Sequence, residues 1–262
     1  NVTTGLPSLQ EVLKRYPRGS SFLKAAFHRV PPSAVMSWFE AQGVPLKIEE
    51  DQRVFPVSDR GTDIVEVFKD LFRHSSCAIL LGHAVTQIQK TTSGFRILFK
   101  EHDPLEAEYL VLTTGGQAYR HTGSTGDGYA FAETLGHTIT PLAASLNAFL
   151  VKESWPKQLA GVSHLDARLS LRAGVEAQGP FLWTHQGLTG PAVFALSSQI
   201  AFETYDATHP LPLLIDLEPT ISEDALQQEL IQFTQKNPKK HLLALLEARL
   251  PRSLAEQLIQ QH

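Results

Sequence analysis

The chain has 262 residues, of which 42% are hydrophobic and 19% are charged, and its formal net charge at pH 7 is −4. A chain of this length buries roughly 70–75% of its unfolded surface, so it can form a core without disulfides or metals. No apolar run reaches the ~18 residues that suggest a membrane helix. The positive charges form no basic stripe, so nucleic acid is not an expected partner. The single cysteine, Cys77, excludes an internal disulfide and fits a reducing, cytoplasmic compartment.

Helical spacing of apolar residues appears twice in the first sixty positions, at residues 8–16 and 33–42. Pro31-Pro32 and Gly43 are typical of the two ends of the second helix. Residues 53–56 predict a short extended piece. The chain begins at Asn1, and its only methionine is Met36, so we expect a fragment or a processed chain.

Residues 62–72 place their apolar side chains on one face and predict a helix capped by Thr62. Residues 78–81 predict a short buried strand, and we expect the adjacent Cys77 to be buried as well. Residues 85–90 and 95–100 flank a glycine-containing turn, and Phe95, Ile97 and Phe99 alternate with the residues between them, which is typical of a hairpin. Residues 109–113 predict a strand that returns to the sheet. This order favours an α/β nucleotide-binding domain with a small antiparallel crossover.

The pattern changes near residue 142, which divides the chain into a first domain (1–142) and a second domain (143–262). The second domain is predicted to be β-rich over 143–219, with short strands at 146–151, 167–173, 181–184 and 213–217. A helix at 192–198 follows Gly190-Pro191, where proline suits the first turn. Residues 220–262 are predicted to be helical, beginning at a capping box formed by Thr220 and Glu223.

Two glycine-containing segments carry the strongest indication of a ligand site. Thr113-Thr-Gly-Gly116 follows a predicted strand, and Gly123-Ser-Thr-Gly-Asp-Gly128 opens a predicted helix. Open α/β sheets bind ligands at such strand ends, and glycine allows the backbone to come close. The second segment is neither a Walker A loop nor G-x-G-x-x-G. Asp127 argues further against phosphate, because a carboxylate in the first turn repels an anion.

His185 ends a predicted strand before Gly187, and it could act as an acid or a base near neutral pH. A structural histidine that hydrogen-bonds a turn is the alternative interpretation. The remaining histidines form no H-E-x-x-H motif and no zinc-type cluster, so no metal site is predicted. No G-x-S-x-G elbow indicates a hydrolase.

Four motifs together resemble one bacterial flavoprotein family, the BaiN/YhiN-like or aminoacetone oxidase family of FAD-binding enzymes. They are Thr-Thr-Gly-Gly (113–116), Gly-Ser-Thr-Gly-Asp-Gly-Tyr (123–129), Leu-Gly-His-Thr-Ile (135–139) and Thr-His-Gln-Gly-Leu-Thr-Gly-Pro (184–191). Asn1-Val-Thr-Thr resembles the tail of a further family segment, and Arg53-Val-Phe-Pro-Val-Ser58 resembles another family block. The resemblance covers nearly the whole chain.

The resemblance implies a partial FAD/NAD(P)-binding Rossmann-like domain with a hairpin crossover, interrupted by an inserted β-rich and helical domain. It implies an FAD-dependent oxidoreductase that acts on a small-molecule substrate, with NAD(P)H as a candidate donor. Its cofactor-binding positions, carried over by motif, are Asn1, Val85, Thr114, Gly115, Gly116, Gly126 and Asp127. His185 would face the cleft from the inserted domain, without an assigned catalytic role.

The family's G-x-G-x-x-G motif and its C-terminal glycine segments have no counterpart in the sequence, and Thr4 replaces a usual asparagine. We therefore expect this chain alone to bind FAD weakly or not at all. Two alternatives remain open: a flavin-free remnant or binding module that retains the inserted domain, and an unrelated α/β small-ligand protein. The sequence does not indicate a substrate or an oligomeric state.

Overall fold

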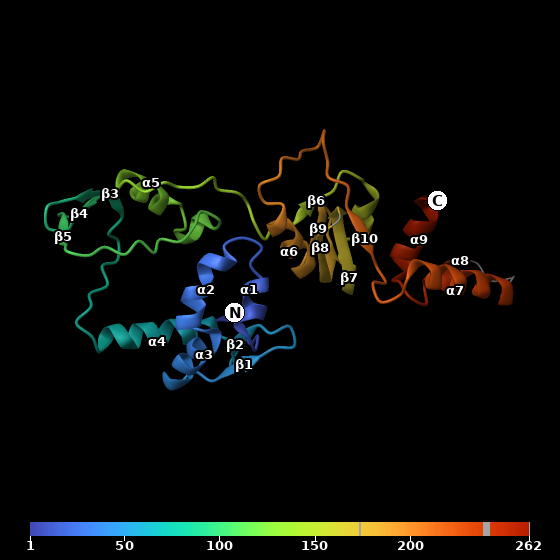
Figure 1. The fold of residues 1–262 in the computed structure, drawn as a ribbon, viewed down its shortest axis with the longest axis horizontal. Coiled ribbons are helices and arrows are strands. Elements are labelled where there is room, and N and C mark those ends of the chain that lie inside the picture. The colour runs from blue at the N-terminus through green and yellow to red at the C-terminus, as the bar shows by residue number, and fades with distance from the viewer. Residues whose placement is uncertain (173, 238–241, 262) are drawn as a thin grey trace. The chain divides into compact units, whose positions relative to one another are not determined.

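The computed structural model describes residues 1–172, 174–237 and 242–261 of a mixed α/β chain, which is the predicted fold class (Figure 1). The chain divides into two compact units, Asn1–Pro141 and Leu142–His262. The division falls where the character of the sequence changes, while the roles of the units as FAD-binding and inserted domains stay predictions. None of the helices in the described ranges is both long and apolar enough to cross a lipid bilayer.

The first unit begins with helices and two short strands. These elements are α1 (Leu9–Lys14), α2 (Ser20–Arg29), α3 (Pro32–Ala41), β1 (Leu46–Ile48), β2 (Val54–Pro56) and α4 (Gly61–Arg73). The Ser8 hydroxyl accepts a hydrogen bond from the Glu11 amide and so begins α1, which satisfies an otherwise unpaired N–H group. Strands β1 and β2 pair antiparallel, and Phe39, Val44 and Val67 form a small core beside them.

The second half of this unit is a three-stranded antiparallel sheet followed by a short helix. The elements are β3 (Val85–Lys90), β4 (Phe95–Phe99), β5 (Leu105–Ala107), a 3₁₀ turn (Arg120–Thr122) and α5 (Asp127–Thr134). The predicted hairpin is confirmed, with Lys90 opposite Phe95 at the turn. Ile88 and Ile97 lie opposite each other in the hairpin and are both buried, because side chains alternate between the two faces of a sheet.

The predictions for residues 78–81 and 109–113 are wrong. Both segments lack regular structure, one before and one after the three-stranded sheet along the chain (Figure 1). Ile79, Leu81 and Val111 are 53%, 83% and 80% exposed, and Cys77 is exposed as well. An apolar run becomes a strand only when a neighbour takes its backbone hydrogen bonds, and no described strand pairs with these two.

The second unit is built on one five-stranded antiparallel sheet in the order β10-β7-β8-β9-β6. Its elements are β6 (Phe149–Leu150), a 3₁₀ turn (Trp155–Leu159), β7 (Ser163–Arg172), β8 (Val175–Trp183), β9 (Gly187–Thr189), α6 (Pro191–Gln199), β10 (Leu214–Asp216), α7 (Glu223–Lys236), α8 (Leu242–Leu246) and α9 (Arg252–Gln261). Pro191 occupies the first turn of α6, as predicted. The packing of α6 against β7, β8 and β9 encloses the main core.

Several boundaries differ from the sequence-based predictions. Thr62 does not cap α4, which begins at Gly61 after Arg60. Ser222 caps α7 in place of Thr220, because its hydroxyl accepts from the Ala225 amide. The helix α2 and the strands β1, β5 and β9 were not predicted, because they are short or lack a clean apolar period. Ala173, the last residue of a predicted strand, lies outside the described residues.

His164 is a buried polar side chain inside the core of the second unit. It is 9% exposed and stacks on Phe181 with ring centroids 5.0 Å apart, and its Nε2 has no hydrogen-bond partner within the described ranges. Burial lowers the pKa of His164, because the charged imidazolium would lose its hydration.

We therefore expect the second unit to lose stability as the pH falls below about 6.5, the ordinary pKa of histidine. The folded state resists a proton that the unfolded state binds, so acid favours unfolding. Urea unfolding at pH 8 and pH 5, followed by Trp155 and Trp183 fluorescence in a Trp38→Phe background, measures this loss. His164→Phe should flatten the pH dependence and keep the stability at pH 8. An equal pH dependence in both proteins would contradict this account.

Candidate functional site

The segment that contains Thr114, Gly115 and Gly116 is a bend in irregular structure. Gly115 has φ +74, a left-handed conformation that favours glycine, and both Thr114 and Gly115 are exposed. The main chain at this bend is therefore open to a ligand. The bend does not follow a strand, contrary to the prediction, because residues 109–113 have no regular structure and pair with no described strand.

The segment that contains Gly126 and Asp127 opens α5, as predicted. Gly126 is the N-cap residue with φ +91, and it offers no side chain to accept hydrogen bonds from the first turn. Asp127 is the first helical residue and its side chain is exposed. The positive end of α5 is thus paired with one carboxylate, an arrangement that suits hydroxyl or N–H groups better than phosphate.

The two bends lie directly against each other. A methyl group on Gly115 would lie 3.3 Å from Ser124 Oγ, and one on Gly126 would lie 3.2 Å from the Cβ of Gln117. A methyl group on Gly128 would overlap Thr114 Oγ1. The glycines therefore allow a close approach that any larger residue would disturb, and the structure brings together Thr114, Gly115, Gly116, Gly126 and Asp127.

The three other predicted site residues, Val85, Asn1 and His185, have no recorded contact with this cluster. Val85 is the first residue of β3, the strand against which α5 packs. Asn1 is exposed at the start of the helical half of this unit, where Val2 N donates to Val54 O at 2.7 Å. His185 belongs to the second unit.

His185 lies in the turn between β8 and β9 and is exposed. The turn is held by Thr184, whose amide donates to Gly187 O at 2.7 Å and whose hydroxyl accepts from the Gly187 amide at 3.0 Å. The turn therefore depends on Thr184 rather than on the histidine. Among the residues that the structure describes, no side chain pairs with His185 to support acid–base chemistry.

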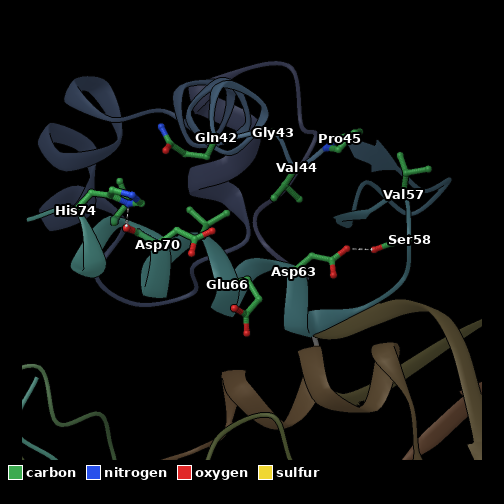
Figure 2. Close-up of a pocket in the computed structure, with 12 residues that line it drawn as sticks. Gln42, Gly43, Val44, Pro45, Val57, Ser58, Asp63, Glu66, Asp70 and His74 are labelled. Atoms are coloured by element: carbon green, nitrogen blue, oxygen red, sulfur yellow. Dashed lines mark hydrogen bonds between the residues drawn. The ribbon is translucent and has the colours of Figure 1, made fainter.

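The structure also contains a cavity of about 630 Å³ that the sequence analysis did not predict (Figure 2). It lies between the turn after α3, the loop after β2 and one side of α4. Its lining combines apolar and polar groups: Gln42, Gly43, Val44, Pro45, Val57, Ser58, Asp63, Glu66, Val67, Asp70, Leu71 and His74. The sequence feature that could have indicated this cavity is the spacing of Asp63, Glu66 and Asp70, which places three carboxylates on one face of the predicted helix.

The carboxylates of this cavity are paired within the chain. Asp63 accepts from Ser58 Oγ at 2.6 Å, a contact drawn in Figure 2, and it also pairs with Arg60 at 2.9 Å. These hydrogen bonds lower the pKa of Asp63, with Ser58 contributing most. Glu66 and Asp70 pair with Lys69 and Arg73. The described residues contain no group of three or more metal-ligating side chains.

This chain belongs to the α/β proteins with a Rossmann domain. More narrowly, it is a member of the HI0933-like family, because the model of the HI0933-like protein Rossmann domain matches residues 1–236. The BaiN/YhiN-like resemblance is thereby confirmed.

Three curated relatives are similar to the chain. A ribosomal RNA dihydrouridine synthase of Haemophilus influenzae is 28% identical over 246 residues, which are 92% of this chain and 58% of the relative. A 3-dehydro-bile acid delta(4,6)-reductase of Clostridium scindens is 26% identical, over 79% of this chain and 51% of the relative. A ribosomal RNA dihydrouridine synthase of Escherichia coli is 27% identical, over 77% of this chain and 48% of the relative. The chain thus spans about half the length of these relatives, and together the family and the reductase support a flavin-type oxidoreductase family.

The contact between the two bends can be tested by a substitution that creates a clash and a second substitution that removes it. Gly128→Ala should destabilise the first unit by about 1–3 kcal/mol, because the new methyl group overlaps Thr114 Oγ1. Adding Thr114→Ala removes that oxygen and should restore most of the loss. Urea unfolding followed by circular dichroism gives the free energies.

Gly61→Ala is the matched control, since Gly61 lies in the first turn of α4 and a methyl group there meets open space. It should be neutral or stabilising by up to about 1 kcal/mol. If Gly128→Ala also leaves the stability unchanged, the two bends do not pack as described.

Proposed function

We propose that this chain is part of an FAD-dependent oxidoreductase whose flavin contacts the paired bends at Thr114–Gly116 and Gly126–Asp127. The observation that carries the proposal is the packing of these two bends within a chain of the HI0933-like Rossmann family. We also propose a cytoplasmic setting and a small-molecule substrate.

The residues at the bends fit part of a flavin nucleotide. The open main chain at Thr114 and Gly115 offers amide and carbonyl groups to a planar ligand, and glycine leaves room for it. The exposed Asp127 would accept hydrogen bonds from hydroxyl or N–H groups and would repel phosphate. In this proposal the flavin ring or its sugar-alcohol chain lies at the bends, and its phosphates are held by other groups.

A bound flavin would supply hydride and electron transfer chemistry, while the protein provides binding, orientation and electrostatics. The chain's own contribution would be to hold the two bends side by side, where Gly128 packs against the Thr114 side chain. Val85 would present its backbone to the adenine from the start of β3. Asn1 would lie near the flavin, as the family resemblance implies. His185 remains a candidate acid or base only if its turn meets the substrate.

The printed names of the relatives suggest a common reaction. A dihydrouridine synthase and a delta(4,6)-reductase both add hydrogen across a carbon–carbon double bond, although their substrates differ. We propose the same reaction class for the protein that contains this chain. NAD(P)H would be the source of hydride.

The test is to express the protein from its complete gene and record its visible absorbance. We expect a yellow protein with stoichiometric FAD that is bleached by NADH or NADPH under anaerobic conditions. Gly115→Val should lower the bound flavin more than tenfold, because φ +74 and the nearby Ser124 Oγ exclude a branched side chain. Gly61→Ala should keep the full flavin content.

Absence of flavin from the folded protein would overturn the proposal and favour the alternative, a flavin-free binding module. The 262-residue chain alone is expected to bind FAD weakly or not at all, so its absorbance does not decide the question. If a folded Gly115→Val variant keeps its flavin, the cofactor does not bind at these bends.

A further inference from the structure

Two hydroxyl groups from the segment that opens α5 lie beside the bend at Gly115 and Gly116. A methyl group on Gly115 would lie 3.3 Å from Ser124 Oγ, and one on Gly116 would lie 3.5 Å from the phenol oxygen of Tyr129. Each hydroxyl is therefore next to one of the two glycines at which we expect a ligand. Neither Ser124 nor Tyr129 is among the cofactor-binding positions that the family resemblance implies.

The ring of Tyr129 holds its hydroxyl in place. Tyr129 lies in the first turn of α5, and its Cδ2 atom would lie 3.5 Å from a methyl group on Gly126. The ring thus packs on one bend while the hydroxyl reaches the other. All five tyrosines lie in the described ranges, and four are exposed whereas Tyr129 is half-buried. A side chain that is already held between two bends loses little rotamer freedom when it binds a ligand.

Both hydroxyls are available for a hydrogen bond. Within residues 1–172, 174–237 and 242–261, neither Ser124 Oγ nor the Tyr129 hydroxyl bonds to another group of the chain, although both residues are half-buried. The hydroxyls of Thr122 and Thr134, by contrast, donate to carbonyls three residues earlier in the chain, at 2.7 and 2.8 Å. Partly covered hydroxyls without a protein partner are open hydrogen-bonding positions, which a ligand or water must fill.

The chemistry of these two groups differs from that of the carboxylate nearby. The ionised Asp127 can only accept hydrogen bonds, whereas a hydroxyl also donates them. A flavin ring carries two carbonyl oxygens along one edge, and each needs a donor. The hydroxyls of Ser124 and Tyr129 supply side-chain donors at the place where the main chain of Gly115 and Gly116 is accessible.

We propose that Ser124 and Tyr129 are binding residues that donate hydrogen bonds to the carbonyl edge of the flavin ring. This inference rests on the proposed function, because the ring belongs to the proposed flavin. It goes further in that it assigns the ring, rather than the sugar-alcohol chain, to the bends and adds two side chains to the site. The alternative is that both hydroxyls bind only water.

The test uses the protein expressed from its complete gene, from which FAD is removed and then titrated back while its fluorescence is recorded. Tyr129→Phe keeps the ring and removes the hydroxyl, and Ser124→Ala removes the other hydroxyl. Each should raise the dissociation constant for FAD about 3–10-fold, as expected for one lost hydrogen bond. The matched controls Tyr119→Phe and Ser93→Ala remove exposed hydroxyls outside the two bends and should bind FAD as the parent does.

The midpoint potential of the bound flavin distinguishes the ring from the sugar-alcohol chain. A donor to a ring carbonyl favours the reduced ring, because reduction adds electron density to that oxygen and strengthens the hydrogen bond. Tyr129→Phe should therefore lower the potential, by about 30 mV if the reduced form loses ten times more affinity than the oxidised form. Tyr119→Phe should leave the potential unchanged.

The position of the ring can be checked on the 262-residue chain without any cofactor. Tyr129→Leu should lower the midpoint of urea unfolding, followed by circular dichroism, because leucine is too short to reach from Gly126 to Gly116. Tyr129→Phe should keep the midpoint of the parent, which also verifies that this variant folds. An unchanged midpoint in Tyr129→Leu would show that the ring does not connect the bends, and the proposal would then fail.

Two results with the complete protein would also refute the proposal. One is an FAD affinity in Tyr129→Phe and Ser124→Ala equal to that of the control variants, and the other is a weakened affinity with an unchanged potential. In both cases the parent still holds its flavin, so the proposed function stands. A folded parent protein without flavin would instead remove the proposed function and this inference together.

Discussion

The contact between Thr114 and Gly128 is the constraint on which the candidate site depends. Because Gly128 has no side chain, the first turn of α5 reaches the Thr114 hydroxyl and the neighbouring bend at Gly115. Two segments that are about ten residues apart in the chain then present their main chains together. In the proposed site the backbone of these two segments would form the ligand surface, and side chains such as Asp127 would select among ligands.

The two units are stabilised in different ways. The second unit has a continuous core, in which residues such as Leu159, Leu169 and Leu196 are fully covered between the sheet and its helices. The first unit has a small core around Phe39 and Val67, and many of its apolar side chains are partly exposed. Its exposed main chain and its cavity are features of a binding surface rather than of a packed interior.

The parts of the fold that depend on local signals could be predicted from the sequence. The hairpin at 85–99, the opening of α5 at Gly126 and the start of α6 at Pro191 are each specified by residues within a few positions. Whether residues 78–81 and 109–113 pair as strands could not be predicted, because pairing depends on a partner distant in sequence, and neither segment finds one among the described strands. The resemblance identified the family correctly, but it could not show that Thr114 contacts Gly128. The cavity was missed because its lining comes from three separate segments.

The exposed stretches around Ile79 and Val111 have a consequence for handling the protein. Neither stretch forms a strand or pairs with one within the described residues, and the side chains of Ile79 and Val111 are 53% and 80% exposed. Such stretches behave like open sheet edges, which recruit a strand from another molecule. Self-association of the purified chain should therefore rise with its concentration and respond to single charged substitutions in these stretches, whereas the net charge of the molecule has less influence.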